Sequence, residues 1–231
     1  MSAEDLTPEA LGQPATETAD RSEFITRTYM HLLGAILLFA GIEYALFQAP
    51  QAEAFAILML SNWMAVLGAF ILVSWIASSV AHKVVSRAGQ YAALGIFVLA
   101  EAIIFLPMFF LALSIDPAIL KNAIGVTLGA FVALTAVAMY SGRDFTFLRS
   151  FLVWAGLIAL GTIGLGLVIG FHLGTYFSMA MIGLAGASIL YDTSKILKVY
   201  PEDRYVAAAL ELFASIALML WYVLRLFLSR R

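Results

Sequence analysis

Two carboxylates stand alone in otherwise apolar stretches near the end of the chain. Asp192 lies in the apolar segment 176–197, and Glu211 lies in the apolar segment 205–228. An ionisable side chain inside a membrane-spanning helix is costly and normally faces the bundle interior or a water-filled path, so it marks a candidate functional site. Carboxylates in such a place can hold a proton or bind a hard cation such as calcium through their oxygens.

The spacing predicts that these two acids lie level with each other. A short polar turn, residues 199–204, joins the two segments into an antiparallel hairpin. If the hairpin folds at the middle of this turn, residue numbers at equal depth sum to about 403, and Asp192 and Glu211 meet this condition. Glu211 then lies roughly 9 Å inside the start of its helix. The alternative is that each acid pairs with a nearby base, Lys195 or Lys198.

A pair of close carboxylates has predictable chemistry. Two such groups about 4 Å apart, at an effective dielectric constant of about 20, repel each other by roughly 4 kcal/mol. The pair is therefore expected to share one proton near neutral pH and to titrate as a unit. Proton and cation compete for the same oxygens, which predicts a pH-sensitive, transient calcium site at Asp192 and Glu211.

Other polar positions are weaker candidates. Glu101 lies in the segment 91–115, six residues before Pro107, whose missing amide leaves a carbonyl free to line a cavity. We interpret Glu101 as a possible pore-lining residue; the alternative is a protonated acid bonded to a neighbouring helix. Glu43, near the end of the first apolar segment, is expected to reach the membrane interface. The three histidines are scattered without helical pairing, so we expect no histidine metal site.

The composition places these residues in a polytopic membrane protein. Of 231 residues, 63% are hydrophobic and only 12% are charged, and the mean hydropathy is +0.96. A membrane span needs about 20 mainly apolar residues. We therefore predict an all-α domain over residues 23–231 with seven spans, near 27–47, 54–80, 91–115, 118–140, 147–170, 176–197 and 205–228. Glycines in the fifth and sixth spans, including Gly156, Gly161, Gly164, Gly170, Gly183 and Gly186, are expected to allow close helix packing.

The N-terminal tail and the loops predict the orientation. Residues 1–22 are polar and acidic and are predicted to be disordered. Nine of the 13 Lys and Arg residues fall in segments that lie on one side if the N-terminus is inside, and four on the other. The N-terminus is therefore predicted to be cytoplasmic, most simply in a bacterial inner membrane, with the last helix crossing fully.

Several classes of protein are not supported by the sequence. The chain has no cysteine, so no disulfide, thiolate metal site or cysteine nucleophile is available. It contains no glycine-rich phosphate loop, His-Glu-x-x-His or Gly-x-Ser-x-Gly motif, and no basic patch with base-stacking aromatics. We expect no enzyme activity, no resident cofactor and no nucleic-acid partner.

Two motifs carry a family resemblance. The segment Ser-Gly-Arg-Asp-Phe-Thr-Phe-Leu at 141–148 and the segment Ile-Leu-Tyr-Asp-Thr-Ser at 189–194 resemble motifs of the Bax inhibitor-1 family. The last helix, with its Ala-rich start and Leu-Trp-Tyr-Val-Leu-Arg-Leu ending, is also similar, so the resemblance covers residues 22–228. It implies six helices packed around a central seventh and a calcium leak path gated by pH through two aspartates. Asp192 matches one of them, and Glu211 stands where the family has the other.

Three function hypotheses follow. The first is a pH-sensitive cation leak channel, with calcium as the permeant ion and acid promoting opening, as the resemblance implies. The second is a non-conducting regulator of a membrane protease or a stress response, for which the acidic N-terminal tail is the best feature. The third, an intramembrane aspartyl protease, is disfavoured because the segment around Glu211 lacks a Gly-x-Gly-Asp motif.

Overall fold

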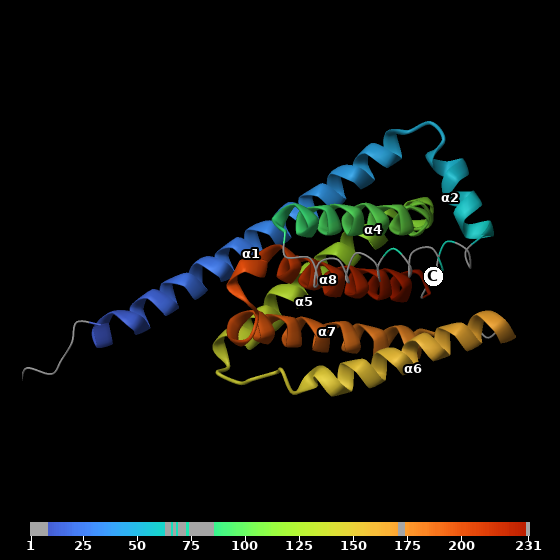
Figure 1. Ribbon diagram of the computed structural model, residues 1–231. Coiled ribbons are helices and arrows are strands. Elements are labelled where there is room, and N and C mark those ends of the chain that lie inside the picture. The colour runs from blue at the N-terminus through green and yellow to red at the C-terminus, as the bar shows by residue number, and fades with distance from the viewer. Residues whose placement is uncertain are drawn as a thin grey trace, which may run out of the picture.

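The computed structural model describes residues 9–62, 86–170 and 174–229, together with positions 66, 68 and 73. Throughout these residues the regular elements are helices (Figure 1). They are α1 (Glu9–Gln48), α2 (Ala52–Ser61), α4 (Arg87–Ile115), α5 (Pro117–Tyr140), α6 (Leu148–Ile169), α7 (Thr175–Lys198) and α8 (Tyr205–Leu228), with a short 3-10 turn η1 (Glu202–Arg204) between the last two.

The helix lengths confirm an all-α polytopic membrane protein. Five described stretches are long and apolar enough to cross a membrane: Asp20–Gln48, Arg87–Ile115, Pro117–Tyr140, Leu148–Gly166 and Glu202–Leu228. α7 also has 24 residues, but it carries the consecutive polar residues Asp192, Thr193 and Ser194, which are buried inside the protein. The predicted span 54–80 begins in α2, and most of its remainder lies outside the described residues.

Local sequence signals set several helix ends. The Asp116 carboxylate accepts a hydrogen bond from the Ala118 amide at 2.9 Å, and Pro117 follows as the first residue of α5. The Ser86 hydroxyl accepts from the Gly89 amide at the start of α4. α6 ends at Gly170, whose φ of 73° belongs to the left-handed region that favours glycine. These signals are local, which is why the predicted starts at 91 and 118 and the predicted end at 170 lie within a few residues of the observed helix ends.

The start of α1 corrects the predicted tail. The first helix begins at Glu9 rather than at residue 27, so the part of the tail from 9 to 22 is helical, while residues 1–8 lie outside the described residues. Extending an existing helix requires only propagation, which is far less demanding than nucleation. Arg21 adds a tertiary anchor, because its side chain donates hydrogen bonds to the end of α7.

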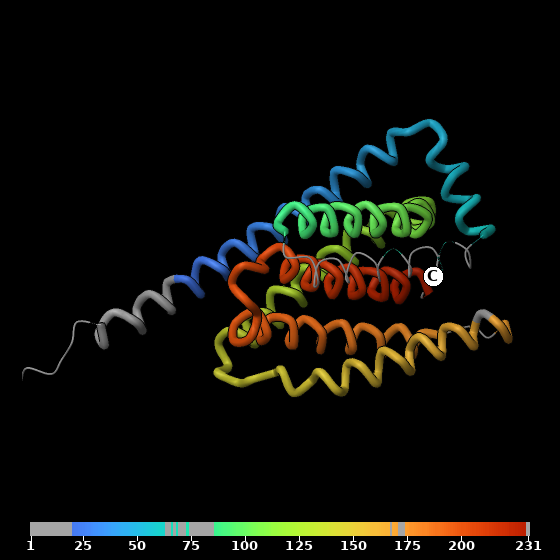
Figure 2. Tube along the Cα trace, in the orientation of Figure 1, coloured from blue at the N-terminus to red at the C-terminus, as the bar shows by residue number. Residues whose placement is uncertain are grey.

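α8 lies at the centre of the bundle (Figures 1 and 2). Most of its side chains are buried, and its main packing partners are α1, α4, α5 and α7. The predicted central seventh helix is therefore present. The described α6 packs mainly against α7, and α2 packs mainly against α4, so these two stand one helix away from the centre.

The centre is filled by interlocking rings rather than by a glycine seam. The Phe39 ring packs edge-on against Phe105 at 5.4 Å and Phe213 at 6.0 Å between centroids. Gly186 is the position of close approach: a Cβ there would lie 3.3 Å from a methyl carbon of Leu134. The expectation of tight packing is wrong for Gly156, Gly161, Gly164, Gly170 and Gly183, where a Cβ would meet open space.

The two ends of the bundle differ in charge. At one end, α1, α4 and α8 meet where His31 bonds the Tyr91 hydroxyl at 2.8 Å and Arg27 lies over the Tyr205 ring. The loop before α6 lies there too, and most basic residues gather at this end. At the other end, the hydroxyls of Thr175 and Ser229 are 3.5 Å apart. α7 and α8 therefore run side by side along their whole length, as a full crossing by the last helix requires.

Candidate functional site

Glu211 lies in α8 and binds a lysine of the neighbouring helix. The Nζ of Lys195 donates to both carboxylate oxygens, at 2.9 and 3.0 Å. The side chains are 24% and 16% exposed, respectively, so the ion pair is mostly shielded. The Lys195 ammonium also lies 4.7 Å from the ring centroid of Tyr200, a cation–π arrangement that holds it in place.

Asp192, on α7, is bound by a hydroxyl of α8. The Ser215 Oγ donates a hydrogen bond of 2.6 Å to the carboxylate of Asp192. The aspartate is 7% exposed and its neighbours Thr193 and Ser194 are fully buried, so the site lies in a polar layer inside the bundle. Such a hydrogen bond to a charged acceptor is among the stronger ones in proteins.

The register across the hairpin explains these partners. Two pairs are in contact, Lys195 with Glu211 and Asp192 with Ser215. In each pair the two residue numbers add up to three or four more than the value of about 403 that was expected for residues at equal depth. Side chains on an α-helix lean toward its N-terminus, so partners across an antiparallel pair lie further along both sequences than backbone depth predicts. The predicted alternative, an acid paired with Lys195, therefore describes Glu211. Direct contact between the two carboxylates stays a prediction.

The pKa of Tyr200, in the turn between α7 and α8, is affected by both acids. Its side chain is almost completely buried. Burial raises the pKa of its hydroxyl strongly, and the negative charges of Glu211 and Asp192 raise it further. A single hydroxyl that senses both carboxylates indicates that the two acids face one region, at the end of the bundle where the hairpin turns.

Arg21 closes the same end from α1. Its guanidinium donates hydrogen bonds to the backbone carbonyls of Ile196, Leu197 and Tyr200. The last carbonyls of a helix have no partners within the helix, and a cation is favourable there because of the helix dipole. Arg21 therefore fixes the end of α7 directly after Lys195.

The loop before α6 braces α7 on its other side. The Phe145 amide donates to the Ser194 hydroxyl at 3.2 Å, and the Asp144 carboxylate lies 3.7 Å from Lys198 Nζ. Asp144 also accepts from the Thr146 amide at 2.9 Å. This backbone hydrogen bond lowers the pKa of Asp144, and the nearby charge of Lys198 lowers it further. The two sequence motifs, 141–148 and 189–194, are thus in contact.

The remaining sequence candidates lie elsewhere. Glu101 is buried in α4, and no hydrogen bond or ion pair joins it to other described residues. Its predicted place along a pore stays a prediction. Glu43 does not reach the interface as expected: it is 5% exposed, because it faces α4 and α8 rather than the end of α1. Among the described residues no group of three or more His, Asp and Glu side chains could hold a metal ion.

The site is a charged cluster of two acids and one ammonium, Asp192, Glu211 and Lys195, between α7 and α8 near the turn that joins them. With both acids ionised it carries one net negative charge, held by Ser215 and Lys195. It can exchange protons, and it can exchange the ammonium for another cation. Sequence reasoning singled out both acids and Lys195; it missed Ser215 and Tyr200. The position of Ser215 one helical turn after Glu211, on the same face, is the signal that would have found it.

Comparison with known proteins gives two matches. Residues 21–231 match the family model described as Inhibitor of apoptosis-promoting Bax1. An uncharacterized membrane protein of Vibrio cholerae serotype O1 is 33% identical over 113 residues, which make up 47% of this chain and 48% of that protein. The chain thus matches about half the length of this relative.

Proposed function

Because the chain belongs to the Bax inhibitor-1 family, whose matched region holds the buried cluster of Asp192, Glu211 and Lys195, we propose that it is a pH-sensitive cation leak channel. Calcium is the proposed permeant ion, since carboxylate oxygens are its preferred ligands. The observation that carries the proposal is the ion pair of Glu211 with Lys195, in which both carboxylate oxygens already hold a cation. The proposal assigns no catalytic step and no resident cofactor.

In this proposal the Lys195 ammonium acts as a tethered cation that closes the path. A permeating cation reaches the oxygens of Glu211 only after Lys195 has left them. Asp192 supplies the second negative charge. It lies one turn before Lys195 in α7, and Ser215 orients its carboxylate. The site thus selects for cations by its net negative charge.

A proton on Glu211 opens this gate. Protonation removes the charge that attracts Lys195, so the ion pair that joins α7 to α8 weakens. Asp192 accepts a hydrogen bond from Ser215 and is the second carboxylate of the cluster. In the proposal, acid releases the lysine from Glu211, and Asp192 is the carboxylate that draws cations through.

Flux measurements in liposomes test the channel. We expect calcium entry by the wild type to rise as the pH falls from about 8 to 6, because a proton on the cluster weakens the hold of Glu211 on Lys195. Lys195→Met and Glu211→Gln should raise the flux at the alkaline end and flatten its pH dependence, and Asp192→Asn should lower the flux throughout. Lys121→Met, which changes an exposed lysine of α5, is the control and should behave as wild type.

Two results would count against the channel. Folded wild-type protein that passes no calcium at any pH would reject conduction. A pH midpoint that is the same in wild type, Glu211→Gln and Asp192→Asn would reject these acids as the gate.

The alternative is a non-conducting regulator of a membrane protease or a stress response. It is favoured by the acidic segment before Arg21 and by the family description, which names an inhibitor. Deleting residues 2–19 separates the two, because this truncation keeps the Arg21 contacts with α7. A channel retains its flux after the deletion, whereas a regulator that works through the tail loses its effect on the stress response. For either function we propose a bacterial inner membrane with the N-terminus inside.

A further inference from the structure

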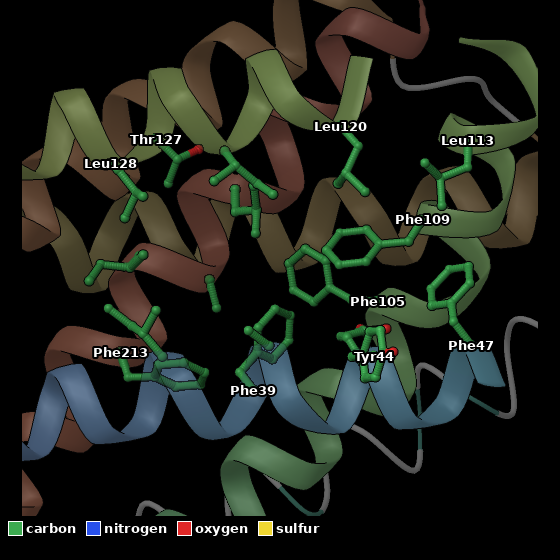
Figure 3. Close-up of a pocket in the computed structure, with 17 residues that line it drawn as sticks. Phe39, Tyr44, Phe47, Phe105, Phe109, Leu113, Leu120, Thr127, Leu128 and Phe213 are labelled. Atoms are coloured by element: carbon green, nitrogen blue, oxygen red, sulfur yellow. The ribbon is translucent and has the colours of Figure 1, made fainter. Parts of the chain in front are cut away.

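A cavity of about 340 Å³ lies on the other half of the bundle, away from Lys195. α1 and α5 form its two sides, and α4 and α8 complete it, as Figure 3 shows. The lining is almost wholly apolar, and it includes the rings of Phe39, Phe105, Phe109 and Phe213. Its volume falls within the range of about 300 to 1,000 Å³ that is typical of small-molecule sites.

Two polar groups in this lining have no hydrogen-bond partner among the described residues. Both carboxyl oxygens of Glu43 and the hydroxyl of Thr127 are buried, and no described residue forms a hydrogen bond with them. Glu43 is 5% exposed and Thr127 is 1% exposed. An unpaired buried carboxyl group is costly, and buried polar groups in proteins are normally hydrogen-bonded. A ligand that pairs with Glu43 would remove this cost.

The lining determines which chemistry can pair with Glu43. The described lining residues include no Lys, Arg or His, so none of them supplies a cation to neutralise the carboxylate. One carboxyl and one hydroxyl cannot supply the six or more oxygens that calcium needs. An ammonium needs only a few acceptors, and the faces of the surrounding rings attract it as well. The rest of the ligand must be apolar, because the rest of the cavity is.

The position of Glu43 among the rings fits such a ligand. It lies four residues after Phe39 and four before Phe47, so the three side chains share one face of α1. In Figure 3, Tyr44 and Phe47 lie toward one end of the cavity, and Phe39 and Phe213 lie toward the other. The carboxyl group therefore has aromatic surface on both sides along the helix.

The cavity is reached from the side of the bundle. Several lining residues are also exposed on the outer surface, among them Tyr44, Ile124 and Leu128. These residues belong to α1, which packs mainly on α8 and α4, and to α5, which packs mainly on α7 and α8. In a membrane this surface faces lipid, so an amphiphilic molecule dissolved in the bilayer has direct access.

We propose that this cavity binds an amphiphilic amine, with the ammonium on Glu43 and the apolar body against the phenylalanine rings. A free amine fits better than the headgroup of a zwitterionic phospholipid, because the described lining offers no basic residue for the phosphate. This site is separate from the cluster at Lys195, so the proposal does not depend on cation conduction.

Equilibrium dialysis of the full chain in detergent micelles tests the proposal, with protein-free micelles as the blank. The probes are 1-adamantylamine and 1-adamantanol, which share one compact apolar cage and differ in charge. We expect saturable binding of the amine, with the alcohol at least about tenfold weaker, because it lacks a charge-assisted hydrogen bond. Glu43→Gln should weaken binding of the amine about tenfold and leave binding of the alcohol unchanged.

Matched variants make the outcome decisive. Glu53→Gln removes an exposed carboxyl from α2 and should leave both affinities at the wild-type value. Ala217→Phe fills the cavity and should abolish saturable binding of both probes. A short-chain phosphatidylethanolamine should not compete with the amine. The proposal is overturned if the wild type shows no saturable binding, if amine and alcohol bind equally, if Glu43→Gln leaves the amine affinity unchanged, or if the phospholipid displaces the amine.

Discussion

Lys195 changes the chemistry that the two acids would have alone. Two carboxylates without a base repel each other and share a proton, whereas Glu211 here is paired with an ammonium. Removing one member of a shielded ion pair leaves the other charge unpaired, and this usually destabilises a protein more than replacing both members by apolar groups.

A double-variant cycle measures how strongly Lys195 and Glu211 stabilise each other. Lys195→Met should lower the stability by about 1 to 3 kcal/mol, because Glu211 loses its cation. Lys195→Met combined with Glu211→Met should recover most of the loss. Thermal unfolding in detergent at pH 8 measures both, with Lys121→Met as the exposed control. If the double variant is less stable than Lys195→Met alone, the two side chains do not stabilise each other as a direct pair.

Asp144 gives a prediction about pH at the end of the bundle. The Thr146 amide and Lys198 hold the pKa of Asp144 below its ordinary value, so the carboxylate stabilises the loop fully above the unfolded pKa. This contribution is lost as the pH falls through the lower, folded-state pKa. Protection of the Thr146 amide from hydrogen exchange should therefore drop below about pH 4. In Asp144→Asn, protection should not vary over this range; a drop of equal size would refute the assignment.

At the scale of elements, the end of α7 is held by segments far away in sequence. Arg21 from α1 satisfies its last carbonyls, and Ser194 and Lys198 join it to the loop 141–147. α7 also carries both Asp192 and Lys195. The geometry of the charged cluster therefore depends on contacts made by α1 and by this loop.

Arg21→Met should loosen the hairpin turn. The carbonyls of Ile196, Leu197 and Tyr200 would lose their donors, so backbone amides across residues 195–204 should exchange with deuterium faster. Arg21→Lys should not restore protection, because one ammonium cannot reproduce the planar guanidinium fork. Arg149→Met changes an exposed arginine in the first turn of α6 and is the control. Unchanged exchange in Arg21→Met would show that the cap is not needed.

At the scale of the whole molecule, charge is concentrated at one end of the bundle. The contacts of Arg21, Arg27 and Lys198 place the start of α1, the end of α7 and the loop 141–147 together there. The turn between α1 and α2 lies at the far end, next to the last residues of α1. Basic residues favour the cytoplasmic side, so this end is predicted to face inward.

The absence of cysteine makes this orientation directly measurable. Gln51→Cys and Ser141→Cys place one thiol in an exposed turn at each end. In intact bacterial cells an impermeant maleimide should label Gln51→Cys and not Ser141→Cys, and permeabilised cells should label both. The reverse pattern would invert the predicted topology.

Much of this architecture is visible in the sequence, because its causes are local. Runs of apolar residues, Asp116 before Pro117, and Gly170 at a helix end are properties of neighbouring residues, and they predict helices and boundaries. A carboxylate in an apolar run is equally visible, which is why Asp192 and Glu211 stood out as candidates. The central position of the last helix followed from the family resemblance.

What only the tertiary structure decided is which atoms meet. Lys195 and Ser215 became the partners of the acids because helical side chains lean along the axis and so shift the contacts between antiparallel helices. Glu43 is buried in an apolar cavity rather than placed at the interface because α1 turns that face toward α4 and α8. A sequence gives the depth of each residue in a membrane helix, but the rotation of the helix depends on all its neighbours at once.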